Sequence, residues 1–190
     1  MLRRATIADV PRIAQLISHF AGRGKMLFRS HAELYETLRD FTVIELPDQP
    51  GIVAGVCALE IVWADLAEVK SLAVAPEYQK RGLGRQLVQA VIQEARDLQI
   101  QRIFALTYEA DFFSRFGFQV VNREALPLKV WSDCIKCPKR DGCDETAMVL
   151  DVLPRPVLAA QDADSTVNLH DDVPTRLVSI NMPRRKPGML

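Results

Sequence analysis

The sequence lacks a long apolar segment, a net charge and a secretory signal. No run of about 18 apolar residues occurs in its 190 residues, so we expect no membrane-spanning helix. The 24 Lys and Arg residues balance 24 Asp and Glu residues, which argues against a nucleic-acid-binding protein with a basic stripe. The N-terminal stretch has two arginines but no apolar core or cleavage site of a signal peptide, so we expect a cytoplasmic protein.

The composition predicts one globular domain followed by a tail. Hydrophobic residues make up 48% of the chain, enough to bury a core. Five of the eleven prolines lie from Pro154 onwards, where the apolar residues are scattered without a period of 2 or 3.6. We therefore expect the domain over residues 1–153 and a flexible tail over residues 154–190.

Strand and helix patterns alternate through the predicted domain. Helical spacing and capping signals predict helices over residues 9–21, 30–41, 82–98 and 111–116. Apolar or alternating runs predict strands over residues 2–6, 42–46, 52–63, 66–74, 102–106, 118–121 and 146–152. An antiparallel meander followed by a β-α-β unit predicts an α/β fold with a mixed, mostly antiparallel sheet flanked by helices.

The junction between the strand ending at Val74 and the helix starting near Gly82 is the most specific segment. A glycine-containing loop, QKRGLG, leads directly into this helix and leaves backbone amides uncovered at its N-terminus. Amides and the positive end of the helix dipole together bind anions, and a pyrophosphate suits such a site. Two glycines alone could mark only a tight turn, but the order of strand, loop and helix favours the anion site. The pattern is neither a Walker loop nor a dinucleotide fingerprint.

The stretch Gln79–Gly84 matches the [QR]-x-x-G-x-[GA] signature, and residues 110–118, ADFFSRFGF, match a second motif of the same family. Over about residues 1–152 the chain resembles the GNAT superfamily of N-acetyltransferases. The resemblance implies acetyl-CoA as co-substrate. It also implies a sheet that opens into a V near residues 72–74, where the pantetheine arm pairs with the strand. The implied cofactor-binding residues are Leu72, Ala73, Val74, Gln79, Lys80, Arg81, Gly82, Leu83, Gly84 and Arg85.

Residues 24–30, 33–41 and 129–150 make the chain similar to the short, single-domain bacterial N-acetylglutamate synthases. This resemblance implies acetyl transfer to the α-amine of L-glutamate, the first step of arginine biosynthesis, and a homodimer. Three alternatives stay open. The acceptor could be another amino acid or a peptide N-terminus, or the chain could be a non-catalytic sensor of acetyl-CoA.

Glu68 lies on the strand four residues before Leu72 and is expected on the same strand face. The resemblance implies that a glutamate at this position is the general base, as in some acetyltransferases of the family. Glu68 could instead simply pair with Lys70. The resemblance implies that the backbone N–H of Leu72 stabilises the oxyanion. Phe113 occupies the position of the tyrosine that is the family's usual acid. Tyr108 is a substitute by proximity, or the thiolate leaves without a dedicated acid.

Cations are the expected ligands of an acceptor with two carboxylates. Arg29, with the adjoining Ser30, lies between the first two helices, where this fold commonly forms its acceptor pocket. A guanidinium can hold a carboxylate through two hydrogen bonds. Lys70 is the second candidate if its strand face opens into the cleft. Each could instead be an ordinary surface charge.

Cys134, Cys137 and Cys143 lie within ten residues of one another. Structural zinc takes four ligands, and no histidine lies near this cluster, so we expect a structured loop without metal on the acceptor side. A dithiol switch at the first two cysteines stays open, although no thioredoxin-like context surrounds them. Cys57 alternates with apolar residues in a strand and is expected in the core.

Overall fold

The computed structural model describes residues 1–46, 48–126, 132–135, 137, 139 and 142–153. The predicted tail, residues 154–190, lies outside this range. Within the range, no helix has the length and apolar character that a membrane span needs.

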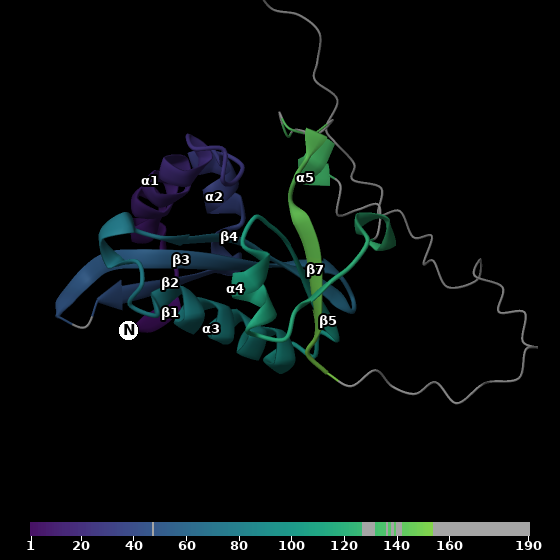
Figure 1. Ribbon diagram of the computed structural model, residues 1–190. Coiled ribbons are helices and arrows are strands. Elements are labelled where there is room, and N and C mark those ends of the chain that lie inside the picture. Colours follow the sequence, from purple (N-terminus) through teal and green to yellow (C-terminus); the bar gives the residue numbers. More distant parts are fainter. Residues whose placement is uncertain (47, 127–131, 136, 138, 140–141, 154–190) are drawn as a thin grey trace, which may run out of the picture. The chain divides into compact units, whose positions relative to one another are not determined.

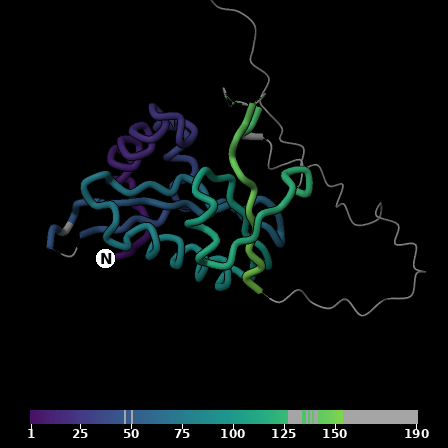
Figure 2. The backbone as a smooth tube through the Cα atoms, viewed as in Figure 1, coloured from purple at the N-terminus to yellow at the C-terminus, as the bar shows by residue number. Residues whose placement is uncertain are grey.

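A mixed sheet of seven strands organises the described part of the chain (Figures 1 and 2). Its strand order is β1-β2-β3-β4-β5-β7-β6, and every neighbouring pair is antiparallel except β4 and β5. This arrangement confirms the expected α/β fold. The strands are β1 (Leu2–Arg4), β2 (Phe41–Leu46), β3 (Gln49–Trp63), β4 (Leu66–Val74), β5 (Arg102–Thr107), β6 (Gln119–Val120) and β7 (Thr146–Asp151).

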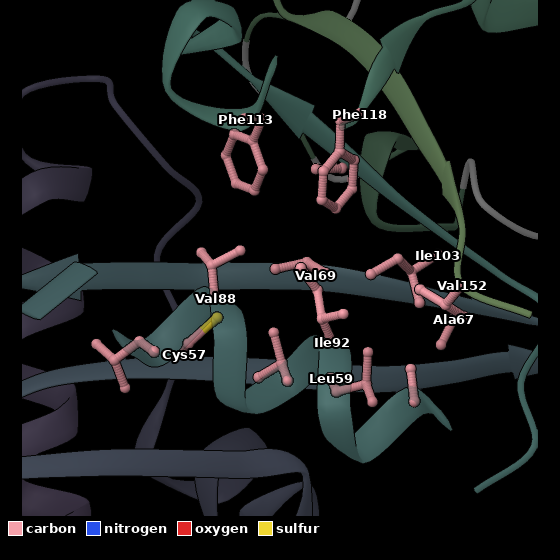
Figure 3. Packing of buried hydrophobic residues seen from close by; sticks show 14 of the residues in the cluster. Cys57, Leu59, Ala67, Val69, Val88, Ile92, Ile103, Phe113, Phe118 and Val152 are labelled. Carbon is pink, nitrogen blue, oxygen red and sulfur yellow. The ribbon is translucent and has the colours of Figure 1, made fainter. Parts of the chain in front are cut away.

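Helices cover both faces of the sheet. On one face, α1 (Val10–Ala21) and α2 (His31–Glu36) pack against β2, β3 and the end of β4. On the other face, α3 (Leu83–Asp97) and α4 (Ala110–Ser114) enclose the larger apolar cluster, part of which Figure 3 shows. The amphipathic pattern of α3 places Leu87, Val88 and Val91 fully inside this cluster. A short helix, α5 (Ser132–Ile135), precedes β7.

The second helix ends earlier than its apolar spacing predicts. The predicted helix through Phe41 was wrong, because α2 stops at Glu36 and a short 3-10 turn covers Leu38–Asp40. Phe41 instead begins β2, where it pairs with Ala58 of β3 and is buried. Strand pairing and burial of the ring outweigh the helical spacing, which three apolar residues define only weakly.

β4 leaves β5 after its first three residues, and this separation opens the sheet. β4 pairs with β5 only at Leu66, Ala67 and Glu68, whereas its pairing with β3 continues to Val74. Figure 1 shows β7 running across the direction of β3 and β4. The edge of β4 that faces β5 is therefore open from residue 69 onwards, as the expected V-shaped opening requires.

A β-bulge lies at the point where the edge opens. The register shifts between Val56 and Ala58 of β3, so Ser71 and Leu72 both lie opposite Cys57. Ser71 has a φ of 53°, in the left-handed region that side chains rarely adopt.

The extra residue changes the face on which the following side chains lie. Val69 and Leu72, three residues apart, both pack on the cluster beneath α3. The prediction that Glu68 and Leu72 share a strand face was therefore wrong, because one inserted residue reverses the alternation.

An ion pair at the N-terminus supports the first strand and helix. Both carboxylate oxygens of Asp9 accept hydrogen bonds from Arg3, at 2.7 and 2.8 Å. The same carboxylate accepts from the backbone N–H and the hydroxyl of Thr6. Hydrogen bonds from Arg3 are the main cause that lowers the pKa of Asp9 from 3.8 to about 2.

We expect Asp9→Asn to lower the free energy of unfolding by about 2 kcal/mol at pH 7. Because the folded pKa is depressed, the carboxylate's contribution is complete above the unfolded pKa of 3.8 and is lost as the pH falls through about 2. Denaturant unfolding of both proteins at pH 7 and pH 3 measures the effect. A difference between them that does not shrink at pH 3 would show that the charge of Asp9 is not its source.

Candidate active site

The open edge of β4 forms one wall of a cleft of about 1440 Å³. The other walls are the connection between α1 and α2, the loop before α3, the end of β5 and the aromatic face of α4. The segment before β7 that carries Cys134, Cys137 and Cys143 completes the lining. Of the residues expected to contact the co-substrate, the cleft is lined by Leu72, Ala73, Val74, Gln79, Lys80, Gly82, Leu83, Gly84 and Arg85.

The loop before α3 is tied to the end of β4. The side-chain amide of Gln79 donates a hydrogen bond of 3.1 Å to the carbonyl of Val74. Lys80 and Gly82 both have a positive φ, 61° and 78°, which turns the chain sharply into the helix. Arg81 is not among the residues that line the cleft, and its guanidinium lies over the ring of Tyr78, 5.5 Å from the centroid.

The N-terminus of α3 has the character of an anion site. Gln86 donates the first i to i−4 bond, to Gly82, so the amides of Leu83, Gly84 and Arg85 precede the helical ladder. The N-cap Gly82 makes no side-chain cap, and the first turn carries no acidic residue. A Cβ at Gly82 would meet no atom within 4 Å. The residues therefore fit the pyrophosphate of acetyl-CoA, which the helix dipole would attract.

The predicted base and the two predicted acceptor-binding cations lie together in the cleft. Lys70 Nζ is 3.3 Å from Glu68 Oε2, so the pairing that the sequence left open as the alternative to a base role does occur. Lys70 also donates a hydrogen bond to Glu60, and Arg29 lies 4.0 Å from the same carboxylate oxygen. The side chains of Arg29, Lys70 and Glu68 are only 14%, 11% and 14% exposed. Such partial burial strengthens electrostatic contacts with a bound ligand.

Ser30 caps α2. Its hydroxyl accepts a hydrogen bond from the N–H of Glu33 at 3.2 Å and donates one to the carboxylate of the same residue at 2.9 Å. These bonds confirm the capping box. Ser30 is not among the lining residues, whereas its neighbour Arg29 is. The structure thus does not bring Ser30 to the cleft wall, and its role in acceptor binding stays a prediction.

Tyr108 follows β5 and lines the cleft. Its phenol oxygen accepts a hydrogen bond of 3.1 Å from Lys139, and the ammonium groups of Lys139 and Lys25 lie 4.8 and 5.5 Å from its ring centroid. Burial is the main cause that raises the pKa of Tyr108. The phenol is protonated at neutral pH, and the raised pKa makes it a weaker acid than an unburied tyrosine.

Phe113 belongs to the core and provides no acid. The residue is buried, and its ring packs edge-to-face against Phe112 and Phe118, with centroids 5.3 and 5.2 Å apart. Figure 3 shows Phe113 and Phe118 together above β4. The packing explains why an aromatic ring without a hydroxyl is tolerated at this position.

Cys134, Cys137 and Cys143 all line the cleft as free thiols. Cys143 Sγ lies 3.8 Å from Glu145, and Arg123 donates a hydrogen bond of 3.5 Å to the carbonyl of Cys143. Burial raises the pKa of the Cys134 thiol. In the described part of the chain, no group of three or more His, Cys, Asp or Glu is arranged to hold a metal ion. Cys57 is buried in the core, as predicted.

Sequence reasoning missed Glu60, Lys139 and Glu145. Glu60 reaches the acceptor-side cations only because the register of β3 and β4 places it opposite Glu68. Lys139 and Glu145 reach the cleft from the segment before β7. Spacing along the chain carries no signal for such contacts, which form only when distant segments meet in the fold.

Known proteins resemble the chain in sequence and structure. A profile described as the acetyltransferase (GNAT) family matches residues 17–118. An amino-acid acetyltransferase of Mycobacterium tuberculosis is 40% identical over 133 residues, which cover 70% of this chain and 76% of that protein.

Two crystal structures share the fold. Rv2747 from Mycobacterium tuberculosis, in complex with CoA and a second ligand, superposes with a TM-score of 0.71 and 34% identity over 80% of this chain and 99% of that one. The N-acetylglutamate synthase of Neisseria gonorrhoeae, complexed with CoA and N-acetyl-glutamate, gives a TM-score of 0.72 and 30% identity. This match covers 81% of this chain but only 35% of the longer enzyme. With the amide-lined N-terminus of α3 and the open edge of β4, these matches show that the chain belongs to the GNAT family of acetyl-CoA-dependent acetyltransferases.

Proposed function

We propose that this enzyme transfers the acetyl group of acetyl-CoA to the α-amine of free L-glutamate. The observation that carries the proposal is the placement of Arg29 and Lys70 beside Glu68, in the same cleft as the N-terminus of α3. Two cations next to a potential base suit an acceptor with two carboxylates and an amine. The relative named amino-acid acetyltransferase and the synthase that holds N-acetyl-glutamate support this choice of acceptor.

The co-substrate side of the cleft orients the thioester. The amides of residues 83–85 would hold the pyrophosphate, and the open edge of β4 would pair with the pantetheine arm. When bound, acetyl-CoA supplies the activated acetyl group. We assign the backbone N–H of Leu72, at the bulge, to stabilise negative charge that develops on the carbonyl oxygen.

Glu68 and Tyr108 would move the protons. Glu68 accepts a proton from the acceptor's ammonium, directly or through a water, so the neutral amine can attack the thioester carbon. A carbon–nitrogen bond forms and the carbon–sulfur bond breaks, so that CoA leaves as the thiolate. The nitrogen of the new amide releases its second proton to water. We assign Tyr108 to donate its phenol proton to that thiolate, after which the phenolate regains a proton from water.

Arg29 would bind one acceptor carboxylate through its guanidinium fork, and Lys70 would bind the other as a point charge. This activity is the first step of arginine biosynthesis and belongs in the cytoplasm. The homodimer that the family resemblance implies stays a prediction, as does the flexible tail.

We expect Arg29→Ala to raise the KM for the amino acid about 10- to 100-fold and to change the KM for acetyl-CoA less than twofold. Removal of a charge-assisted hydrogen bond accounts for an effect of this size. Steady-state kinetics with each substrate varied in turn measures both constants. Arg23→Ala is the matched control, because Arg23 donates a hydrogen bond to the backbone carbonyl of His19 and is not a lining residue. Equal increases in both KM values would exclude Arg29 as an acceptor ligand.

A further inference from the structure

Glu60 lies directly opposite Glu68 in the antiparallel pairing of β3 and β4. Two like charges in such a cross-strand pair repel each other. Lys70 bridges them, because its ammonium group hydrogen bonds to Glu60 and lies 3.3 Å from Glu68. The pair of glutamates is thus held together by a cation that the proposed function assigns to the acceptor.

The same Glu60 oxygen contacts both acceptor-side cations. It accepts the hydrogen bond from Lys70 and lies 4.0 Å from Arg29 Nη2. Glu60 itself is not among the residues that line the cleft, and its side chain is 38% exposed, against 11% for Lys70. The carboxylate of Glu60 is therefore not placed to contact an acceptor directly. Any influence that it has on acceptor binding passes through Lys70 and Arg29.

Asp40 belongs to the same electrostatic group. Burial, followed by the negative charge of Glu60, raises the pKa of Asp40, while Lys70 and Arg29 lower it. The 3-10 turn that holds Asp40 connects α2 to β2, so charges from three parts of the chain surround the two cations.

We propose that Glu60 is a positioning residue for acceptor recognition, which fixes the Lys70 ammonium and the Arg29 guanidinium in the orientation that binds the acceptor's carboxylates. This inference rests on the proposed function. Long cationic side chains have many rotamers, and a shared carboxylate removes most of that freedom before the acceptor binds. Glu60 also keeps the Lys70 ammonium beside the Glu68 carboxylate, so the distance between the base and this cation stays fixed.

A general electrostatic role would have the opposite sign. Loss of the Glu60 charge leaves the cluster more positive, which by itself would attract an acidic acceptor and lower its KM. Loss of positioning instead raises this KM. The direction of the change therefore separates the two roles.

The test compares Glu60→Gln, Glu60→Asp and the control Glu94→Gln in the full chain. Glu94 forms a comparable ion pair with Arg4 outside the cleft. We expect Glu60→Gln to raise the KM for L-glutamate about tenfold, with the KM for acetyl-CoA within twofold of the parent. Glu60→Asp should recover most of the loss, and Glu94→Gln should change neither constant by more than twofold. A lower or unchanged KM for L-glutamate in Glu60→Gln, or equal increases in both constants, would overturn the proposal.

A second readout does not depend on the identity of the acceptor. Labelling with a small amine-reactive ester, followed by peptide mass spectrometry, reports how well the Lys70 ammonium is held. We expect Glu60→Gln to increase labelling of Lys70 at least fivefold while labelling of Lys25 and Lys80 stays constant. If the parent enzyme acetylates no amino acid, the proposed function fails, yet unchanged Lys70 labelling would still refute the positioning by Glu60 on its own.

Discussion

Glu68→Gln is expected to lower kcat about 10²- to 10⁴-fold, the range typical for loss of a general base. Glutamine has the shape of glutamate and can still accept a hydrogen bond from Lys70, which lies 3.3 Å away, but it cannot take a proton from the acceptor. The KM for acetyl-CoA should stay within about twofold, because the amides at the start of α3 are unaffected.

The pH dependence tests this role further. The acceptor's ammonium loses its proton to solvent at high pH, so a variant without the base should recover activity as the pH rises from 7 to 10. CoA release under saturating substrates measures kcat across this range. The control is Glu77→Gln, which removes an exposed carboxylate that is not among the lining residues. If Glu68→Gln lowers kcat less than tenfold at pH 7, or if the ratio of its kcat to that of the parent enzyme does not change with pH, the assignment of Glu68 as the base is contradicted.

Gly82→Asp is expected to raise the KM for acetyl-CoA about 10- to 100-fold, because a carboxylate would stand where the amides of α3 bind pyrophosphate. Gly82 has a φ of 78°, a conformation that Asp and Asn adopt more readily than other side chains. The added Cβ has open space around it. The substitution therefore tests charge with little steric disturbance.

Gly82→Asn is the matched control, since it has the same shape without the charge. Its KM for acetyl-CoA should rise less than fivefold, and the difference between the two variants should shrink in 0.5 M salt, which screens exposed charges. The melting temperatures of both variants should be similar. Equal KM values for the Asp and Asn variants would mean that no anion binds at the start of α3.

The sequence predicts most of this fold because its regular elements have clear periods. The stripe on α3 and the apolar run of β4 occur where they are predicted, with α3 at Leu83–Asp97 and β4 at Leu66–Val74. The loop before α3 is predictable for the same reason, since its glycines and its position between strand and helix define its chemistry locally.

Features that depend on pairing between distant segments were not predictable. Nothing in the apolar pattern of β4 marks the bulge at Ser71 and Leu72. Regular strand alternation therefore places Leu72 on the wrong face of the sheet. Phe41 continues a helical pattern yet pairs with Ala58. Glu60 acquires its two cationic partners only through the register of β3 with β4 and through the connection between α1 and α2.

CoA release from acetyl-CoA, measured with the purified chain against a panel of acceptors, tests the central claim most directly. The panel contains L-glutamate, L-glutamine, L-aspartate, glycine and a short peptide with a free N-terminus. Arg29 and Lys70 beside Glu68 predict the highest kcat/KM for L-glutamate, about tenfold or more above the other acceptors. A preference for the peptide, or acetyl-CoA binding without CoA release for any acceptor, would contradict the account.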